Sequence, residues 1–293
     1  MELEGCYTAL VTPFRNGQVD YGALRELIEF QISSGIDGLV PVGTTGESPT
    51  LDFDEHRKVI EFVVETVRHR SLVIAGSGAN STAEAIDLTH HAASVGADAT
   101  LQVTPYYNKP TAEGLYRHFA AVADQCGLPV VLYNVPGRTG REIPVNIIAR
   151  LATHTAVVAV KEAGGSVERV SAILDECNLV VLSGDDALTL PMMAVGATGV
   201  ISVASNVIPR EVTDMVHAAL QERWQDARQA HRRLYPFFRD LFVETNPIPV
   251  KAALAALGRI APEYRLPLCE MSAANRLTLI ASMRRAGIPC EAT

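Results

Sequence analysis

Eight short apolar runs, rich in β-branched residues, recur up to about residue 203 and constrain the fold more than any other feature of the chain. Helical stretches separate the runs, and this alternation is typical of a parallel sheet with helices on its outer face. Each run is almost continuously apolar, as expected of a strand buried on both faces. The runs are YTALVTPF (7–14), GLVPVG (38–43), LVIAGSG (72–78), ATLQVTP (99–105), PVVLYNVP (129–136), VVAVKE (157–162), LVVLSG (179–184) and GVISV (199–203).

Amphipathic helices are predicted between these runs, and residues such as Ser81 and Thr111 are typical helix caps. The clearest helical segments are 21–33, 54–69, 82–94, 112–125 and 144–151. Eight strand-and-helix units favour an α/β fold closed as a (β/α)8 barrel, or TIM barrel, over an open doubly wound sheet. A dinucleotide-binding sheet also lacks its usual fingerprint, because no GxGxxG follows the first strand.

The alternation of strands and helices stops after about residue 224. The remainder predicts helices over 225–242, 247–257 and 270–286, punctuated by prolines. A barrel of this kind needs about 250 residues, so the length leaves room for a small appendage. We therefore predict a catalytic barrel over 1–224 and a small C-terminal helical domain over 225–293, packed on the barrel.

Composition narrows the class of partner. The formal charge of -8 and the isoelectric point near 5.5 argue against nucleic acid and anionic membranes, both of which select basic surfaces. The N-terminus is acidic where a targeting peptide would be basic, and no apolar run approaches the ~18 residues that span a bilayer. We expect a cytoplasmic enzyme whose cysteines are reduced thiols without zinc-ligand spacing, namely Cys6, Cys126, Cys177, Cys269 and Cys290.

Active sites of such barrels lie at the carboxyl ends of the strands, where Lys161 closes the apolar run VVAV. Burial favours the neutral form of a lysine amine, which is the form that attacks a carbonyl. A surface or salt-bridged lysine is the competing interpretation. Asp185 and Asp186 follow the next strand, but two adjacent carboxylates without a matching His or Glu cluster make a weak metal site, and we predict none.

Other strand ends carry polar side chains that fit this chemistry. The hydroxyl of Tyr133 could move protons, although a core tyrosine is the competing interpretation. Thr44 could relay a proton, and the backbone of Thr44, Thr45 and Gly46 could donate to a substrate carboxylate. Arg138, in a loop rich in glycine and proline, is either a bidentate carboxylate clamp or an exposed loop arginine.

These strand ends belong to a longer set of motifs spread over nearly the whole chain. With them, the sequence resembles the dihydrodipicolinate synthase family of the lysine and diaminopimelate pathway, within the Schiff-base class I aldolase superfamily. The matching motifs are ALVTPF (9–14), GTTGES (43–48), AGSGAN (75–80), VTPYYNKP (103–110), LYNVPGRTG (132–140), VKEA (160–163), SGDDA (183–187), GVISV (199–203) and NPIPVK (246–251).

The resemblance implies a lyase that condenses pyruvate with L-aspartate-4-semialdehyde and needs no cofactor beyond the imine formed on Lys161. It implies that Tyr133, Thr44 and Tyr107 form a proton relay, with Tyr107 reaching in from a neighbouring subunit of a homotetramer, a dimer of dimers. Thr45 and nearby amides would hold the pyruvate carboxylate. The remaining site residues would be Arg138, which would clamp the carboxylate of the semialdehyde, and Gly184 and Ile201, which would line the site through backbone groups.

The resemblance also implies feedback inhibition by L-lysine. Five residues match the family's allosteric lysine site, namely Ser48, His56, Asn80, Glu84 and Tyr106. Glu84 would supply the anionic partner that a lysine ammonium needs. Phe53 and Pro49 depart from the family pattern, in which histidine and alanine are common, and both would weaken lysine binding.

Two rival functions remain open. N-acetylneuraminate lyases and 2-keto-3-deoxy sugar-acid aldolases of the same superfamily share the lysine and the tyrosine, but they generally lack an arginine at the position of Arg138. A catalytically inactive relative that serves as a scaffold or sensor is the third interpretation. The presence of Lys161, Tyr133 and Thr44 argues against it.

Overall fold

A computed structural model of the chain describes residues 3–289, and within them eight parallel strands close into a barrel. Neighbouring strands pair in the order β1-β10-β9-β8-β7-β6-β5-β4, and β4 returns to β1. The predicted (β/α)8 fold is confirmed. The barrel strands are β1 (Gly5–Ala9), β4 (Gly38–Val40), β5 (Leu72–Gly76), β6 (Ala99–Val103), β7 (Val130–Asn134), β8 (Val157–Glu162), β9 (Val180–Ser183) and β10 (Gly199–Ser202).

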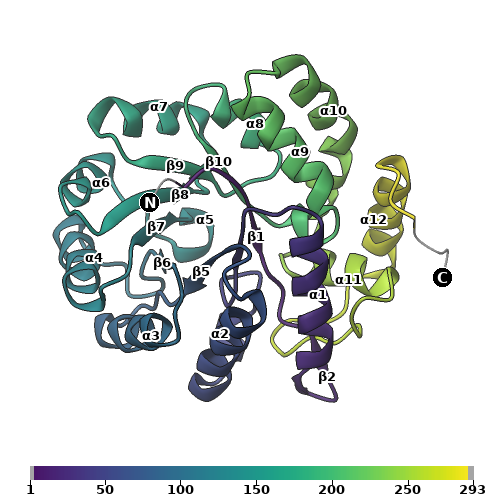
Figure 1. The fold of residues 1–293 in the computed structure, drawn as a ribbon, viewed down its shortest axis with the longest axis horizontal. Coiled ribbons are helices and arrows are strands. Elements are labelled where there is room, and N and C mark those ends of the chain that lie inside the picture. The colour runs from purple at the N-terminus through teal and green to yellow at the C-terminus, as the bar shows by residue number, and fades with distance from the viewer. Residues whose placement is uncertain (1–2, 290–293) are drawn as a thin grey trace.

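Helices follow the strands and surround the barrel (Figure 1). Ser81 and Thr111 cap α3 and α4 as predicted, because each side chain accepts a hydrogen bond from a backbone amide of the first turn. The surrounding helices are α1 (Tyr21–Ser33), α2 (Phe53–Val67), α3 (Thr82–Ser94), α4 (Ala112–Cys126), α6 (Val145–Ala152), α7 (Val167–Glu176), α8 (Thr189–Met193) and α9 (Pro209–Leu220).

The predicted strand over 7–14 was wrong at both ends. Strand β1 begins at Gly5 and ends at Ala9, and the chain beyond it enters a small antiparallel hairpin, β2 (Phe14–Arg15) and β3 (Gln18–Val19). Asn16 and Gly17 turn this hairpin with φ of 53° and 75°. The apolar pattern ran on because Leu10 and Val11 are buried next to the barrel without forming its strand.

The strands are covered by apolar layers on both faces, which explains why they appear in the sequence as continuous apolar runs. One layer fills the barrel and contains, among others, Tyr7, Val40, Ile74, Leu101, Val131, Tyr133, Ala159, Leu182 and Ile201. The other lies between the strands and the helices, where Val160, Val181 and Val200 pack. Alternate residues of a strand point to opposite faces, so each strand contributes to both layers.

The chain beyond α9 is helical, as predicted, with α10 (Trp224–Asp240), α11 (Ile248–Ala256) and α12 (Ala273–Arg285). Helix α10 packs along α9, and α12 packs against α10 and α11, so this tail lies on one side of the barrel (Figure 1). The first of these helices begins beside the predicted boundary at residue 225. The division into two domains at that point stays a prediction.

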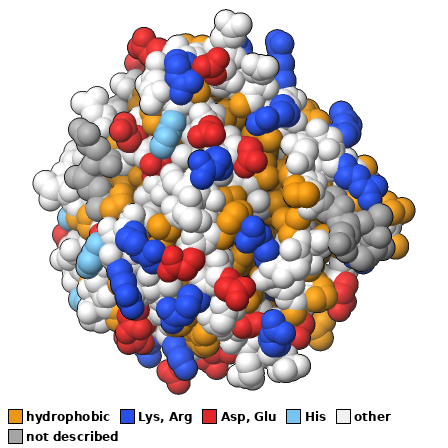
Figure 2. Space-filling view, turned by 45° about the vertical axis from the view of Figure 1, so that its right-hand side comes forward, with side chains coloured by type: hydrophobic (Ala, Val, Ile, Leu, Met, Phe, Trp, Pro, Cys, Tyr) orange, Lys and Arg blue, Asp and Glu red, His pale blue; other side chains and the backbone are white. Residues whose placement is uncertain are grey.

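No helix among residues 3–289 is long and apolar enough to cross a bilayer. On the face shown in Figure 2, basic and acidic side chains are interspersed rather than gathered by sign. Four cysteines are free thiols, namely Cys6, Cys126, Cys177 and Cys269, while Cys290 lies outside the described residues.

Candidate active site

Lys161 and Tyr133 lie side by side on neighbouring strands of the barrel. They are paired in the register of β8 and β7, and the lysine Nζ lies 4.2 Å from the centroid of the tyrosine ring. Lys161 shares the inward face of β8 with Ala159 and is only 6% exposed. Within residues 3–289 no carboxylate pairs with its amine. The surface and salt-bridge interpretations of Lys161 are therefore wrong.

Of the two residues expected to line the site through their backbones, Gly184 lies next to Lys161 and Ile201 lies in the same layer inside the barrel. Gly184 directly follows β9, and its amide donates to the carbonyl of Glu162 at 2.8 Å. A Cβ at residue 184 would lie 3.0 Å from Cε of Lys161 and 2.6 Å from Cβ of Ala163, so only glycine fits there without displacing a neighbour. Ile201 is fully buried in the layer inside the barrel, together with Tyr133.

The predicted carboxylate-binding residue Thr45 lies in a turn over 43–47 at the carboxyl end of β4. Thr45 is buried, and its Oγ1 accepts a hydrogen bond of 3.0 Å from Nδ2 of Asn246. The amide of Gly46 donates to the carbonyl of Gly43 and is thus used within the turn. Thr44 is half-buried, and no hydrogen bond joins its hydroxyl to Tyr133 within residues 3–289.

Arg138 lies in the loop after β7 and contacts the same residue, Asn246, as Thr45 does. It belongs to the short helix α5 (Pro136–Thr139) after β7, and its side chain is exposed. One guanidinium nitrogen, Nη2, donates to the backbone carbonyl of Asn246 at 3.1 Å. Asn246 therefore contacts both Thr45 and Arg138.

Tyr107 is exposed in a single chain, whereas Lys161 and Tyr133 are buried. Its side chain is 90% exposed, and its backbone adopts a left-handed φ of 71°. A tyrosine that is both exposed to solvent and held in a left-handed backbone conformation is uncommon. The role of Tyr107 as a residue supplied to a neighbouring subunit stays a prediction.

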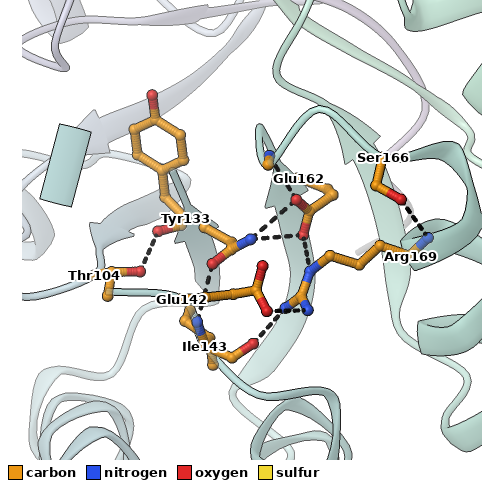
Figure 3. A network of polar contacts seen from close by, with 9 residues as sticks. Thr104, Tyr133, Glu142, Ile143, Glu162, Ser166 and Arg169 are labelled. Carbon is orange, nitrogen blue, oxygen red and sulfur yellow. Dashed lines mark hydrogen bonds and ion pairs between the residues drawn. The ribbon is translucent and has the colours of Figure 1, made fainter. Parts of the chain in front are cut away.

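The residue after the lysine, Glu162, supports the site from the outer side of the barrel (Figure 3). Its buried carboxylate accepts hydrogen bonds from Nδ2 of Asn134 at 2.9 and 3.0 Å and from Nε of Arg169 at 2.9 Å. Arg169 also pairs with Glu142 at 3.0 Å and donates to the carbonyl of Ile143. This network ties β7 and β8 to the segment that leads away from Arg138, while the ring of Tyr133 points away from it.

Asp186 is held within the fold by hydrogen bonds. Its fully buried carboxylate accepts hydrogen bonds from the Ser202 hydroxyl at 2.5 Å and from the amides of Val203 and Ala204 at 3.0 and 2.9 Å. Burial raises its pKa to about 6, although the hydrogen bonds oppose the rise. No group of three or more His, Cys, Asp or Glu side chains within residues 3–289 could hold a metal ion.

The residues matched to a lysine site surround a cavity of about 400 Å³ near η1 (Ser48–Thr50). Ser48, His56, Glu84 and Tyr106 line it, together with Pro49 and Phe53. Asn80 stands beside it and donates to the carbonyl of Tyr106 at 3.2 Å. Burial lowers the pKa of His56 to about 4, so this ring is neutral at pH 7 and would offer a lysine ligand no charge.

Sequence reasoning assigned no role to two tail residues that contact the 43–47 turn. Asn246 and Lys251 belong to the motif NPIPVK (246–251), but the sequence analysis predicted no function for either residue. Lys251 is fully buried, and its Nζ lies 2.5 Å from Oε1 of the equally buried Glu47. A usable signal existed for Lys251, because it is the only charged residue of the otherwise apolar helix IPVKAALAA. No comparable signal existed for Asn246.

The chain is similar to known proteins over nearly its whole length. The family model described as the dihydrodipicolinate synthetase family matches residues 2–286. A curated relative from Geotalea uraniireducens (strain Rf4), named 4-hydroxy-tetrahydrodipicolinate synthase, is 53% identical over 97% of this chain and 99% of its own length.

Two solved structures of similar proteins contain ligands. The chloride-inhibited dihydrodipicolinate synthase of Acinetobacter baumannii, complexed with pyruvate, superposes with a TM-score of 0.96 at 43% identity, covering 98% of this chain and 100% of that one. The enzyme of Cyanidioschyzon merolae with lysine bound superposes with a TM-score of 0.95 at 41% identity, covering 98% and 99%.

Proposed function

The chain belongs to the dihydrodipicolinate synthetase family, and from that premise we propose that it condenses pyruvate with L-aspartate-4-semialdehyde through an imine on Lys161. This is the 4-hydroxy-tetrahydrodipicolinate synthase reaction, and the enzymes named for it are carbon–oxygen lyases. The observation that carries the proposal is the amine of Lys161, which is buried at the carboxyl end of a barrel strand, free of any carboxylate among residues 3–289, and adjacent to a tyrosine ring.

The proposed reaction begins when the neutral Nζ of Lys161 attacks the ketone carbon of pyruvate. Loss of water gives the imine, which withdraws electrons so that a methyl proton can leave and an enamine form. The enamine carbon attacks the aldehyde of the semialdehyde. The amino group of that substrate then displaces the lysine as the ring closes, which returns Lys161 to its free form.

In this scheme, side-chain hydroxyl groups carry out the proton transfers. Tyr133 lies beside the amine and is the nearest predicted proton carrier. Thr44 would relay protons from the 43–47 turn, and Tyr107 would complete the relay from a neighbouring subunit of a homotetramer. Gly184 and Ile201 would line the substrate through their backbones.

Two positions would hold the substrate carboxylates. Thr45 and the nearby amides would bind pyruvate, and Arg138 would bind the semialdehyde. The exposed guanidinium of Arg138 at the edge of the site favours this second substrate over the sugar-derived aldehydes of N-acetylneuraminate lyases and sugar-acid aldolases. The reaction needs no metal or organic cofactor in this scheme, and treatment with a chelator should leave the rate unchanged.

We also propose that L-lysine inhibits the enzyme by binding the cavity lined by Ser48, His56, Glu84 and Tyr106, beside Asn80. The lysine-bound relative supports this assignment, and Glu84 would pair with the ligand ammonium. Steady-state rates in millimolar L-lysine test it, and an unchanged rate would contradict it.

The proposed reaction is tested by turnover of pyruvate and the semialdehyde, combined with borohydride reduction in pyruvate and peptide mapping. We expect turnover, and a reduced pyruvate adduct on Lys161 that the Lys161→Arg variant lacks. Lys109→Arg is the matched control, because Lys109 is exposed and outside the barrel interior. An adduct on Lys161 without turnover would assign a sister aldolase activity, and the absence of any adduct would remove the imine mechanism.

A further inference from the structure

Asn246, in the connection before α11, joins the two residues that the proposed function assigns to the substrate carboxylates. Its side-chain amide donates to Oγ1 of Thr45 at 3.0 Å, and its backbone carbonyl accepts from Arg138 at 3.1 Å. We propose that Asn246 is a positioning residue that turns the hydroxyl proton of Thr45 toward the pyruvate carboxylate and holds Arg138 beside it. This inference rests on the proposed function, because Thr45 and Arg138 bind the substrates only in that scheme.

The direction of the hydrogen bond carries the argument. A threonine hydroxyl has one proton to donate and two lone pairs that accept. Because Asn246 already donates to Thr45, the hydroxyl is an acceptor in that contact and its proton stays available. A carboxylate only accepts hydrogen bonds, so a threonine with a free proton is the form that binds it. Thr45 is 3% exposed and Asn246 is 4% exposed, so water competes little for this contact.

A second contact fixes the tail against the same turn. Lys251 lies in α11, and its Nζ bonds Oε1 of Glu47, two residues after Thr45. Both side chains are fully buried, and the lysine ammonium also lies 4.3 Å from the ring centroid of Phe14. The segment from Asn246 to Lys251 is therefore attached to the 43–47 turn at both ends. The side chain of Asn246 has little freedom to change its distance from Thr45.

The two contacts of Asn246 concern different substrates, because Thr45 is assigned to pyruvate and Arg138 to the semialdehyde. The contact with Thr45 comes from the side chain, whereas the contact with Arg138 comes from the backbone and survives replacement of the side chain. Asn246→Ala should therefore weaken pyruvate binding and leave semialdehyde binding close to normal. A general loss of folding would affect both substrates together.

The first half-reaction provides the direct readout. The pyruvate concentration that gives half-maximal borohydride trapping on Lys161 is measured by mass spectrometry in the full-length enzyme, without the second substrate. For Asn246→Ala we expect this concentration to rise roughly tenfold, the usual effect of losing a hydrogen bond to a charged or bound group. The KM for the semialdehyde should change by less than about twofold, since the loss is confined to one substrate.

Asn275→Ala is the matched control. Its side-chain amide also donates a hydrogen bond in the tail, to Glu244 at 2.7 Å, but it touches neither Thr45 nor Arg138. We expect wild-type half-saturation by pyruvate in this variant. Thermal unfolding of both variants separates a local change at the site from a loss of stability.

A conservative variant and a double variant test the direction of the hydrogen bond. Asn246→Asp keeps the shape, but the new carboxylate would attract the Thr45 proton and repel pyruvate, so half-saturation should rise at least as far as in Asn246→Ala. In the Thr45→Val background, adding Asn246→Ala should have no further effect, because the asparagine acts through the threonine.

The outcomes distinguish this inference from the proposed function. An adduct on Lys161 with wild-type pyruvate dependence in Asn246→Ala or Asn246→Asp would overturn the positioning role while leaving the imine mechanism intact. Additive effects of Thr45→Val and Asn246→Ala would overturn it as well. No adduct in the wild-type enzyme would instead refute the proposed function.

Discussion

At the scale of single residues, the site depends on the alternation of side chains along a strand. Lys161 points into the barrel and Glu162 points out of it, although the two are adjacent in the chain. The inward residue lies beside Tyr133, and the outward residue binds Asn134 and Arg169. The end of β8 thus carries the reactive group on one face and the support for that group on the other.

The hydroxyl of Tyr133 can be tested without disturbing the ring that packs beside Lys161. Tyr133→Phe should lower kcat by about 10²- to 10³-fold, the usual contribution of a proton-transferring group, at an unchanged thermal midpoint. Tyr7→Phe is the control, because Tyr7 also lies inside the barrel but its hydroxyl donates to the carbonyl of Glu4. Steady-state kinetics measure the effect, and a kcat within twofold of wild type would exclude proton transfer by Tyr133.

Asp186 predicts a pH dependence of stability. Burial raises its pKa in the folded protein to about 6, above the ordinary aspartate pKa of 3.8 that applies to the unfolded chain. The unfolded chain therefore releases this proton at lower pH, and the contribution of Asp186 to the free energy of unfolding falls by about 3 kcal/mol as pH rises from about 4 to about 6.

Urea unfolding of wild type and Asp186→Asn between pH 4 and pH 8 isolates this contribution, because asparagine does not titrate. The free energy of unfolding of the wild type, relative to that of the variant, should decrease between about pH 4 and about pH 6 and then stay level up to pH 8. A difference independent of pH would show that Asp186 has the same pKa in both states.

At the scale of elements, the catalytic end of the barrel depends on the helical tail. The 43–47 turn follows β4, but the groups that hold it, Asn246 and Lys251, come from the start of α11 and the connection before it. Arg138 in α5 is bound to the same connection. The tail therefore does more than cover the barrel, since it sets the distance between two loops that follow different strands.

Removing only one partner of the buried ion pair between Lys251 and Glu47 should strongly destabilise the folded protein. Lys251→Met leaves the carboxylate of Glu47 buried without its partner, so the free energy of unfolding should fall by about 3–5 kcal/mol. Adding Glu47→Gln removes the charge and should recover most of that loss. Arg15→Met is the control, because the exposed pair of Arg15 and Asp20 should contribute no more than about 1 kcal/mol. Urea unfolding measures all four proteins, and equal losses in the single and double variants would contradict the argument.

At the scale of the whole molecule, a single copy of the chain leaves the proposed proton relay incomplete. Tyr107 is exposed in solution, whereas Tyr133 and Lys161 lie inside the barrel. A residue that acts across an interface ties activity to assembly, because each site then needs a second subunit. Light scattering should find a tetramer, and a fully active monomer at assay concentration would contradict the proposal.

Mixing two inactive variants tests the sharing of Tyr107 directly. Lys161→Ala lacks the nucleophile and Tyr107→Phe lacks the shared hydroxyl, so each alone should be almost inactive. After unfolding and refolding together, about a quarter of the sites should combine an intact Lys161 with an intact Tyr107 from the neighbour, and that share of activity should return. Equal mixtures of unshuffled variants are the control, and no recovery after refolding would place Tyr107 outside the neighbour's site.

The barrel could be predicted from the sequence because its strands are buried on both faces and therefore appear as apolar runs, as VVAVKE does for β8. Strand ends were harder to predict. Leu10 and Val11 continue the apolar pattern of β1 but pack outside it, since a buried loop residue can be as apolar as a strand residue. Lys161 was predictable for the same reason as the strand, because a charge that ends an apolar run lies at the edge of the core.

The eight barrel strands, the position of the lysine at a strand end and, through the motifs, the family could all be predicted from the amino-acid sequence alone. How the helical tail holds the 43–47 turn depends on tertiary packing. The bond between Asn246 and Thr45 spans 201 positions and that between Lys251 and Glu47 spans 204, so no local periodicity could predict either. Local patterns report which face of an element is buried, whereas the partners of a buried polar group are set by how distant elements pack.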